Sequence, residues 1–221
     1  MMNTQTLQTL IRHHREQPIR PGFDDDGKAV WLAILQKLDE LVRPVAAEVD
    51  AVEKNQQLSN QGKQDMLMKI GPRVVGNFVN LGIVLKQADT AKARLEKILF
   101  DPITSKPTGD AVVTFLREDS IRRTVGKAGA EAKFLKALDT DDLESARALL
   151  DWPGGPTVSD AIVKRGRVAY AQRTNPDAWQ KLQYVEFLRE NLAALAAPVA
   201  QWLIHLGASA ESVQKATKAK D

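Results

Sequence analysis

The stretch WLAILQKLDELVRPVAAEVDAV, from Trp31 to Val52, carries apolar residues at alternating steps of four and three. These apolar positions are Trp31, Leu35, Leu38, Val42, Val45, Val49 and Val52. A spacing that averages about 3.5 residues keeps one stripe of a helix apolar and is typical of helices that pack along one another. The stretch therefore predicts a long helix that starts near Gly27 or Lys28, just after the acidic run 24–26. Pro44 predicts a kink within it.

A similar register follows the polar segment EKNQQLSNQGKQ at 53–64. Its apolar positions are Leu67, Val74, Phe78, Leu81, Leu85, Ala88, Leu95 and Leu99. Gly71-Pro72 predicts a break into a short and a long helix, and Gly76 and Gly82 indicate close backbone packing in the long one. Two such seams joined by a short polar connection predict an elongated, coiled-coil-like antiparallel hairpin over residues 28–100.

A third seam lies near the end of the chain. Its positions are Val185, Leu188, Leu192, Leu195, Val199, Trp202 and Leu206. Asn175 and Pro176 have the chemistry of a helix cap and a first helical residue, and Gly207 that of a terminator. Pro198 predicts a bend or a break in this helix, and residues 208–221 read as a polar tail.

The proline-rich loop from Phe100 to Asp110 is the predicted division of the chain, with Asp110 capping the next helix. Three shorter helices are expected beyond it, in AVVTFLREDSIRRTV, AEAKFLKAL and DDLESARALL, with Asp139 or Thr140 as a cap for the third. The stretch WPGGP at 152–156 then predicts a corner between an acidic and a basic helix.

These patterns predict an all-α fold, because no segment shows the alternation of a strand. The predicted parts are an N-terminal helix and linker at 1–27, the hairpin at 28–100, a bundle of shorter helices at 110–207 and the tail at 208–221.

Composition narrows the classes of function. Of 221 residues, 43% are hydrophobic and 27% are charged, which is typical of a folded domain. The absence of cysteine excludes thiolate chemistry and disulfides. His13 and His14 are adjacent and would point about 100° apart on a helix, which does not suit a shared metal, and His205 lies near a helix end. No enzyme signature is present, so we expect no catalysis, cofactor or metal.

Charge gives one alternative. The net charge of +3 is too small to identify nucleic acid as a partner. The acidic set at 139–144 is interpreted as helix N-terminal acids, because it lacks the glycine and the distal glutamate of a calcium loop. A basic set with Tyr170 among it could contact phosphates, or could be solvated or paired with acids. This basic set comprises Lys164, Arg165, Arg167 and Arg173.

The segment FLREDSIRRTVGKAGAEAKFLKALDTDDLESARALLDWPGGP, followed by a basic helix and a long Leu- and Ala-rich helix, resembles helical proteins encoded among the virion genes of tailed bacteriophages. The sequence LSNQGKQ, residues 58–64, is similar to the LS-x-x-G sequence at which a helix begins in those proteins. In those proteins the capped helix ends in an A-L-L-x-x-P sequence, which here is ALLDWP. This chain departs from their pattern in having glycines where they have a second proline, and in lacking the apolar residues that follow that sequence. The resemblance implies a virion-associated or assembly protein without catalytic residues to carry over.

The sequence therefore predicts a non-enzymatic helical structural or protein-interaction protein. We expect a protein partner or a homo-oligomer, no membrane association, and a location in a cytoplasm or a virion, since the N-terminus lacks the apolar core of a signal peptide. The alternative is a nucleic-acid-binding regulator that uses the helix around 164–173. The expected helix-interface seam comprises Trp31, Leu38, Val45, Phe78, Leu81, Leu85, Leu192, Leu195 and Trp202.

Overall fold

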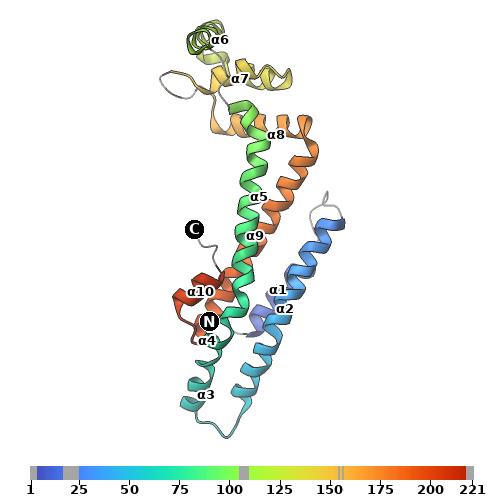
Figure 1. The fold of residues 1–221 in the computed structure, drawn as a ribbon, viewed down its shortest axis with the longest axis vertical. Coiled ribbons are helices and arrows are strands. Elements are labelled where there is room, and N and C mark those ends of the chain that lie inside the picture. The colour runs from blue at the N-terminus through green and yellow to red at the C-terminus, as the bar shows by residue number, and fades with distance from the viewer. Residues whose placement is uncertain (1–3, 17–24, 105–109, 154, 156, 218–221) are drawn as a thin grey trace. The chain divides into compact units, whose positions relative to one another are not determined.

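A computed structural model describes residues 4–16, 25–104, 110–153, 155 and 157–217, and these residues form helices without any strand (Figure 1). The elements are α1 (Thr4–Glu16), α2 (Asp25–Lys54), α3 (Asn60–Leu67), α4 (Ile70–Val74), a 3-10 helix η1 (Val75–Phe78), α5 (Val79–Thr104), α6 (Ala111–Asp139), α7 (Leu143–Leu150), α8 (Asp160–Thr174), α9 (Pro176–His205) and α10 (Ala210–Thr217). The predicted all-α class is confirmed.

The chain divides into two compact units. Unit 1 comprises residues 1–92 and 183–221, and unit 2 comprises residues 93–182. The chain passes between them within α5 and within α9, so the division does not fall at the predicted loop of 100–110. That loop prediction is wrong for residues 100–104, which belong to α5, and residues 105–109 lie outside the described residues. The division also differs from the predicted domains because the last helical region belongs with the first. The seam of α9 needs an apolar surface to pack on, and the hairpin region supplies it.

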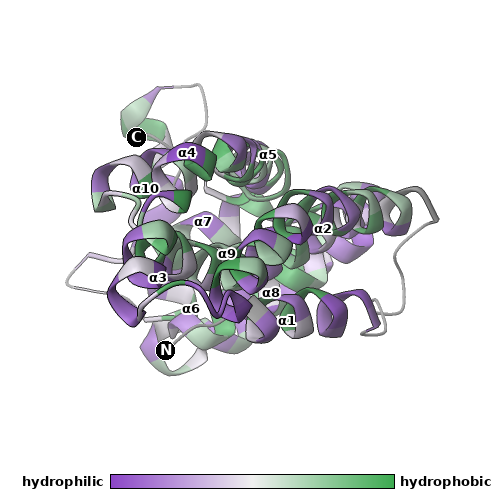
Figure 2. Cartoon of the chain, turned by 90° about the horizontal axis from the view of Figure 1, so that it is seen from below, coloured by the Kyte–Doolittle hydropathy of each residue, from purple (hydrophilic) through white to green (hydrophobic). Residues whose placement is uncertain are grey.

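Unit 1 contains the first and third predicted seams and the second as far as Ala88, whereas Leu95 and Leu99 of the second seam lie in unit 2. All seven seam positions of α2 are buried, and residues of α1, α4, η1, α5, α9 and α10 share the same core. Aromatic rings join α9 to the earlier helices edge to face: Trp31 lies 5.6 Å from Phe187, and Phe78 lies 6.4 Å from Trp202, between ring centroids. Figure 2 shows hydrophobic and hydrophilic residues alternating along α2, as an amphipathic helix requires. Residues 28–92 of the predicted hairpin thus form only part of this core, which α9 completes, and residues 93–100 belong to unit 2.

Two long helices of unit 1, α2 and α9, continue through a proline. α2 includes Pro44 and α9 includes Pro198, so neither residue ends its helix. Proline removes one backbone hydrogen bond. Buried residues on both sides of it hold the two halves of each helix in the common core, and Val42 and Val45 do so in α2.

The predicted polar tail is wrong in part, because residues 210–217 form α10 and bury Val213 and Ala216. Gly207 ends α9 with a φ of +92°, as predicted, and a Cβ there would lie 2.0 Å from the carbonyl oxygen of Met68. Nearby, the Gly71 amide donates to the Leu206 carbonyl at 2.8 Å. These backbone contacts fix the end of the chain to the start of α4.

The close packing predicted for glycines occurs at Gly71 rather than at Gly76. A Cβ at Gly71 would lie 2.6 Å from the amide nitrogen of Ala208, whereas Gly76 has no atom within 4 Å of that position. Gly71 and Pro72 both lie inside α4, and the predicted break falls just before them, between α3 and α4. Proline is tolerated there because the first turn of a helix has no internal partner for its missing N–H.

Unit 2 has a smaller core around Phe134, Leu138 and Leu149. Gly126 has a φ of +67° and interrupts α6, so the two predicted helices of this region are the two parts of α6. Asp142, rather than Asp139 or Thr140, caps α7, and its side chain accepts from the Ser145 amide at 3.0 Å.

The WPGGP corner lies between α7 and α8. Gly155 has a φ of +112°, a conformation that L residues resist, and no atom lies within 4 Å of the position of a Cβ. Its neighbours Gly154 and Pro156 lie outside the described residues. The positive φ of Gly155 matches the turn that the sequence predicts.

Among the residues that the structure describes, no helix combines the length and apolarity needed to cross a bilayer.

Candidate interaction surface

The first turns of α6 are fixed by a side-chain cap. Asp110 has an extended backbone, and its carboxylate accepts from the Val112 amide at 2.8 Å. This confirms the predicted cap and sets the direction in which the helix starts. The residues that follow, AVVTFL, hold four large apolar side chains within five positions.

These four side chains are exposed. Val112, Val113, Phe115 and Leu116 form what we call the α6 apolar patch, and between 46% and 66% of the surface of each residue is open to solvent. A few isolated apolar residues on a surface are ordinary, but neighbouring ones are typical of contact surfaces. The α6 apolar patch is therefore the strongest candidate for a contact with another protein.

Further along α6, the helix is anchored by Arg122, which is only 5% exposed. Its guanidinium donates to the carbonyl oxygens of Ala148 and Asp151, each at 2.9 Å, and to the carboxylate of Glu118 at 2.9 Å. Arg122 thus satisfies carbonyl groups at the end of α7, which a helix leaves without internal partners. This arrangement holds the helix that carries the patch against the end of α7 within unit 2.

The sequence did not reveal either feature. AVVTFL is apolar on several sides of a helix at once, so it has no single stripe that would separate a core face from a contact face. Arg122 is one of several arginines in this helix, and nothing in their spacing distinguishes the buried one. The one available signal is that AVVTFL has more large apolar residues than a single buried face of a helix can hold, so some of them must be exposed.

The predicted basic set does not form one surface. Arg173 binds the carboxylate of Asp141 with two bonds of 2.8 and 3.0 Å and also donates to the Leu138 carbonyl. This contact lowers the pKa of Asp141 and raises that of Arg173. Arg167 lies over the ring of Phe100, 5.8 Å from its centroid. Only Lys164 and Arg165 are exposed without a contact of this kind in the described residues, so two cations remain for a phosphate backbone.

The acidic set at 139–144 serves the helices of unit 2. Asp142 caps α7, Asp141 binds Arg173, and Glu144 lies 4.0 Å from Arg117. Within the described part of the chain, no three carboxylate or imidazole groups come together as metal ligands would.

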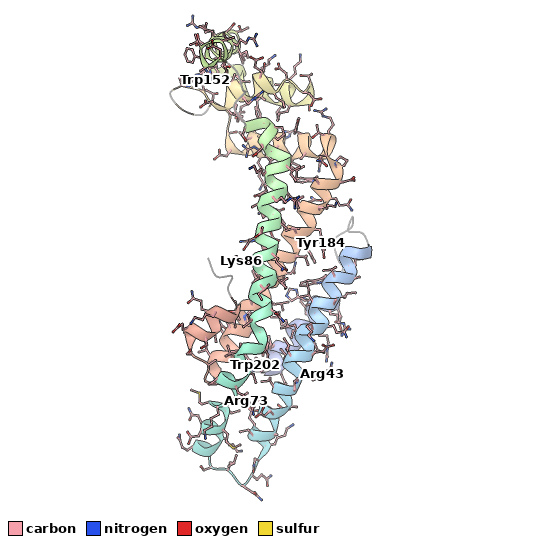
Figure 3. The ribbon with its side chains drawn as sticks, in the orientation of Figure 1. Arg43, Arg73, Lys86, Trp152, Tyr184 and Trp202 are labelled. Carbon is pink, nitrogen blue, oxygen red and sulfur yellow. The ribbon has the colours of Figure 1, made fainter. Side chains whose placement is uncertain are left out.

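The nine residues of the expected helix-interface seam meet in the core of unit 1. Eight are buried, and Leu85 is half-buried against them. Trp202 lies among them (Figure 3). The seam therefore joins helices of this chain, and it is not an open surface for another one.

The histidines occupy three different environments. His13 is exposed, and His205 is exposed in the last turn of α9, where a cation suits the helix end. His14 is half-buried, with its ring 6.4 Å from that of Trp31. Burial lowers the pKa of His14, and the neighbouring His13 lowers it further. Of the adjacent pair, His13 is therefore a surface residue and His14 is partly enclosed.

Comparison with known proteins gives no relative. No family model, no curated protein and no solved structure matches the chain.

Proposed function

We propose that this chain is a non-enzymatic helical structural protein that assembles with other protein chains, a second copy of itself included. The observation that carries the proposal is the α6 apolar patch, whose four large side chains lie exposed on a helix that Arg122 anchors to α7. Apolar area removed from water on contact is the main driving force of protein association.

A place in a virion or in its assembly is the form of this function that the resemblance to phage virion proteins supports. Such proteins act by contact between chains, and the exposed patch is consistent with that role.

Sedimentation velocity of the full chain over a range of concentrations tests the proposal. We expect association that weakens in the double variant Phe115→Ser/Leu116→Ser, because both side chains are exposed and their loss removes apolar area without opening a core. The matched control is Ile98→Ser, which changes a residue of unit 2 that is 48% exposed but lies outside the patch. A monomer at every concentration, or equal weakening by the control, would contradict self-association through the α6 apolar patch.

Nucleic-acid binding by the helix around 164–173 is the alternative, and the pairing of Arg173 with Asp141 weighs against it. Fluorescence anisotropy with duplex and single-stranded DNA over a salt series tests it. Salt-dependent binding that Arg165→Ala weakens would favour the alternative.

A further inference from the structure

A groove of about 300 Å³ lies in unit 1 between α5 and α9. The two helices run antiparallel here (Figure 1), because ion pairs join Asp89 to Arg189 and Lys92 to Glu186. Thr217, the last residue of α10, also lines the groove. Three helices of one unit therefore form it.

The walls of this groove are apolar and open to contact. Ala193, Ala197 and Ala200 lie four and three positions apart, so they share one face of α9, and Leu85 lines the groove from α5. Ala193 and Ala197 are exposed, and Leu85 and Ala200 are half-buried, so another molecule can touch them. Side chains as short as these leave room between two helices that larger side chains of a third helix can fill.

The rim of the groove carries no net charge. Its two charged side chains, Asp89 and Arg189, bind each other. A charged group brought onto the apolar wall would lose water without gaining a partner. The groove therefore suits an apolar, uncharged segment of another chain.

The α6 apolar patch has the matching chemistry. Val112, Phe115 and Leu116 occupy positions i, i+3 and i+4, the spacing with which a helix lays its apolar face in a hydrophobic groove. The charged side chains that follow the patch on α6 are paired within their own chain, so the helix brings no free charge to the contact. These pairs are Arg117–Glu144, Glu118–Arg122 and Asp119–Arg123.

From this match we propose that the α6 apolar patch of one copy of this chain docks in the α5–α9 groove of a second copy. The inference rests on the proposed function and names the surface that the patch contacts. The contact joins two different surfaces, so a pair of copies still has one free patch and one free groove. Assembly of this kind continues beyond a dimer, into a chain or a closed ring.

A groove variant, Ala193→Gln/Ala197→Gln, tests the contact in sedimentation velocity of the full chain. The longer polar side chains fill the groove, and we expect association to weaken by about tenfold or more. Both positions are exposed on α9, so circular dichroism and melting should match the parent chain. The matched control is Ala29→Gln/Ala33→Gln, the same change with the same spacing at exposed positions of α2, which should leave association within about twofold.

Mixing two variants tests the pairing of the two surfaces directly. The patch variant Phe115→Ser/Leu116→Ser keeps its groove, and the groove variant keeps its patch. Each variant alone should be monomeric at concentrations where the parent chain associates. An equimolar mixture should form a one-to-one dimer and nothing larger, because only one working patch and one working groove remain. The restored dimer would also show that both variants are folded.

Three outcomes would overturn this inference. If the groove variant associates like its control while the patch variant does not, the patches of two copies meet each other, and the proposed function stands without the groove. A mixture that stays monomeric would exclude the pairing of patch with groove. A parent chain that is monomeric at every concentration would contradict both this inference and self-association through the patch.

Discussion

The two units of this chain are stabilised in different ways. Unit 1 has a large apolar core in which three regular seams meet, and its polar side chains lie mostly at the surface. Unit 2 has a smaller apolar core and adds polar contacts that close its loops, led by the buried Arg122 and by Arg173 on Asp141. A regular seam is visible in a sequence, whereas a buried cation that binds backbone carbonyls is not. The difference explains why sequence reasoning described one unit better than the other.

The largest effect is expected from Arg122→Ala in unit 2. The change leaves two carbonyl groups and the carboxylate of Glu118 without their donor in a site where little water reaches them. Breaking a buried pair in this way costs about 3–5 kcal/mol of the free energy of unfolding. Hydrogen exchange followed by mass spectrometry should show faster exchange in residues 93–182 and little change in unit 1.

Arg123→Ala is the matched control. The Arg123 side chain is 80% exposed and pairs with Asp119 at the surface, so its loss should cost less than about 1 kcal/mol. If the two variants were equally stable, the polar contacts of Arg122 would not be what holds unit 2.

Leu192→Ala is expected to have the next largest effect, and in unit 1. Leu192 is fully buried in the core that α9 shares with α2 and η1, so the change leaves a cavity and should cost about 2–5 kcal/mol. Urea unfolding checks the loss. Ile204→Ala, which truncates an exposed side chain of the same helix, should cost far less. A small effect of Leu192→Ala would mean that residues 28–100 hold together without α9.

The sequence predicted the helices better than their association. The seam from Trp31 to Val52 is buried at every position, and the caps at Asp110 and Asn175 are as predicted, because these features depend on neighbours along the chain. The pairing of residues 183–217 with the first unit was missed. It depends on the approach of Gly71 and Gly207 to distant backbone, which no local pattern reveals.

The same reasoning applies to the candidate sites. The basic set was chosen from local charge, and the structure pairs Arg173 with an aspartate 32 positions earlier. The α6 apolar patch was missed, because it depends on what the fold leaves uncovered.

Removal of a helix cap in unit 2 should lower the free energy of unfolding by a smaller amount. Asp142→Ala removes the acceptor for the Ser145 amide at the start of α7, which costs about 1 kcal/mol. Hydrogen bonds from Ser145 lower the pKa of Asp142 below its ordinary value of 3.8. The stabilisation by this carboxylate is therefore present above that pH and is lost as the pH falls through the lowered pKa. Asp142→Asn, which keeps an acceptor oxygen, should lose less in thermal melts at neutral pH, and equal losses would contradict the role of the cap.

The smallest effect is expected at His14 in unit 1, and it depends on pH. Burial lowers the pKa of His14 below its ordinary value of 6.5, with a further contribution from His13 and opposition from Asn191. Above pH 6.5 the imidazole is neutral in both states and has no effect on pH dependence. As the pH falls below that value the unfolded chain binds the proton first, so stability decreases, and the loss levels off below the lowered pKa. Thermal melts across this window should show a steeper decrease for the parent chain than for His14→Gln, while His205→Gln, at an exposed position at the end of α9, should follow the parent. Parallel curves for the parent and His14→Gln would show that the burial of His14 does not disfavour the charged ring.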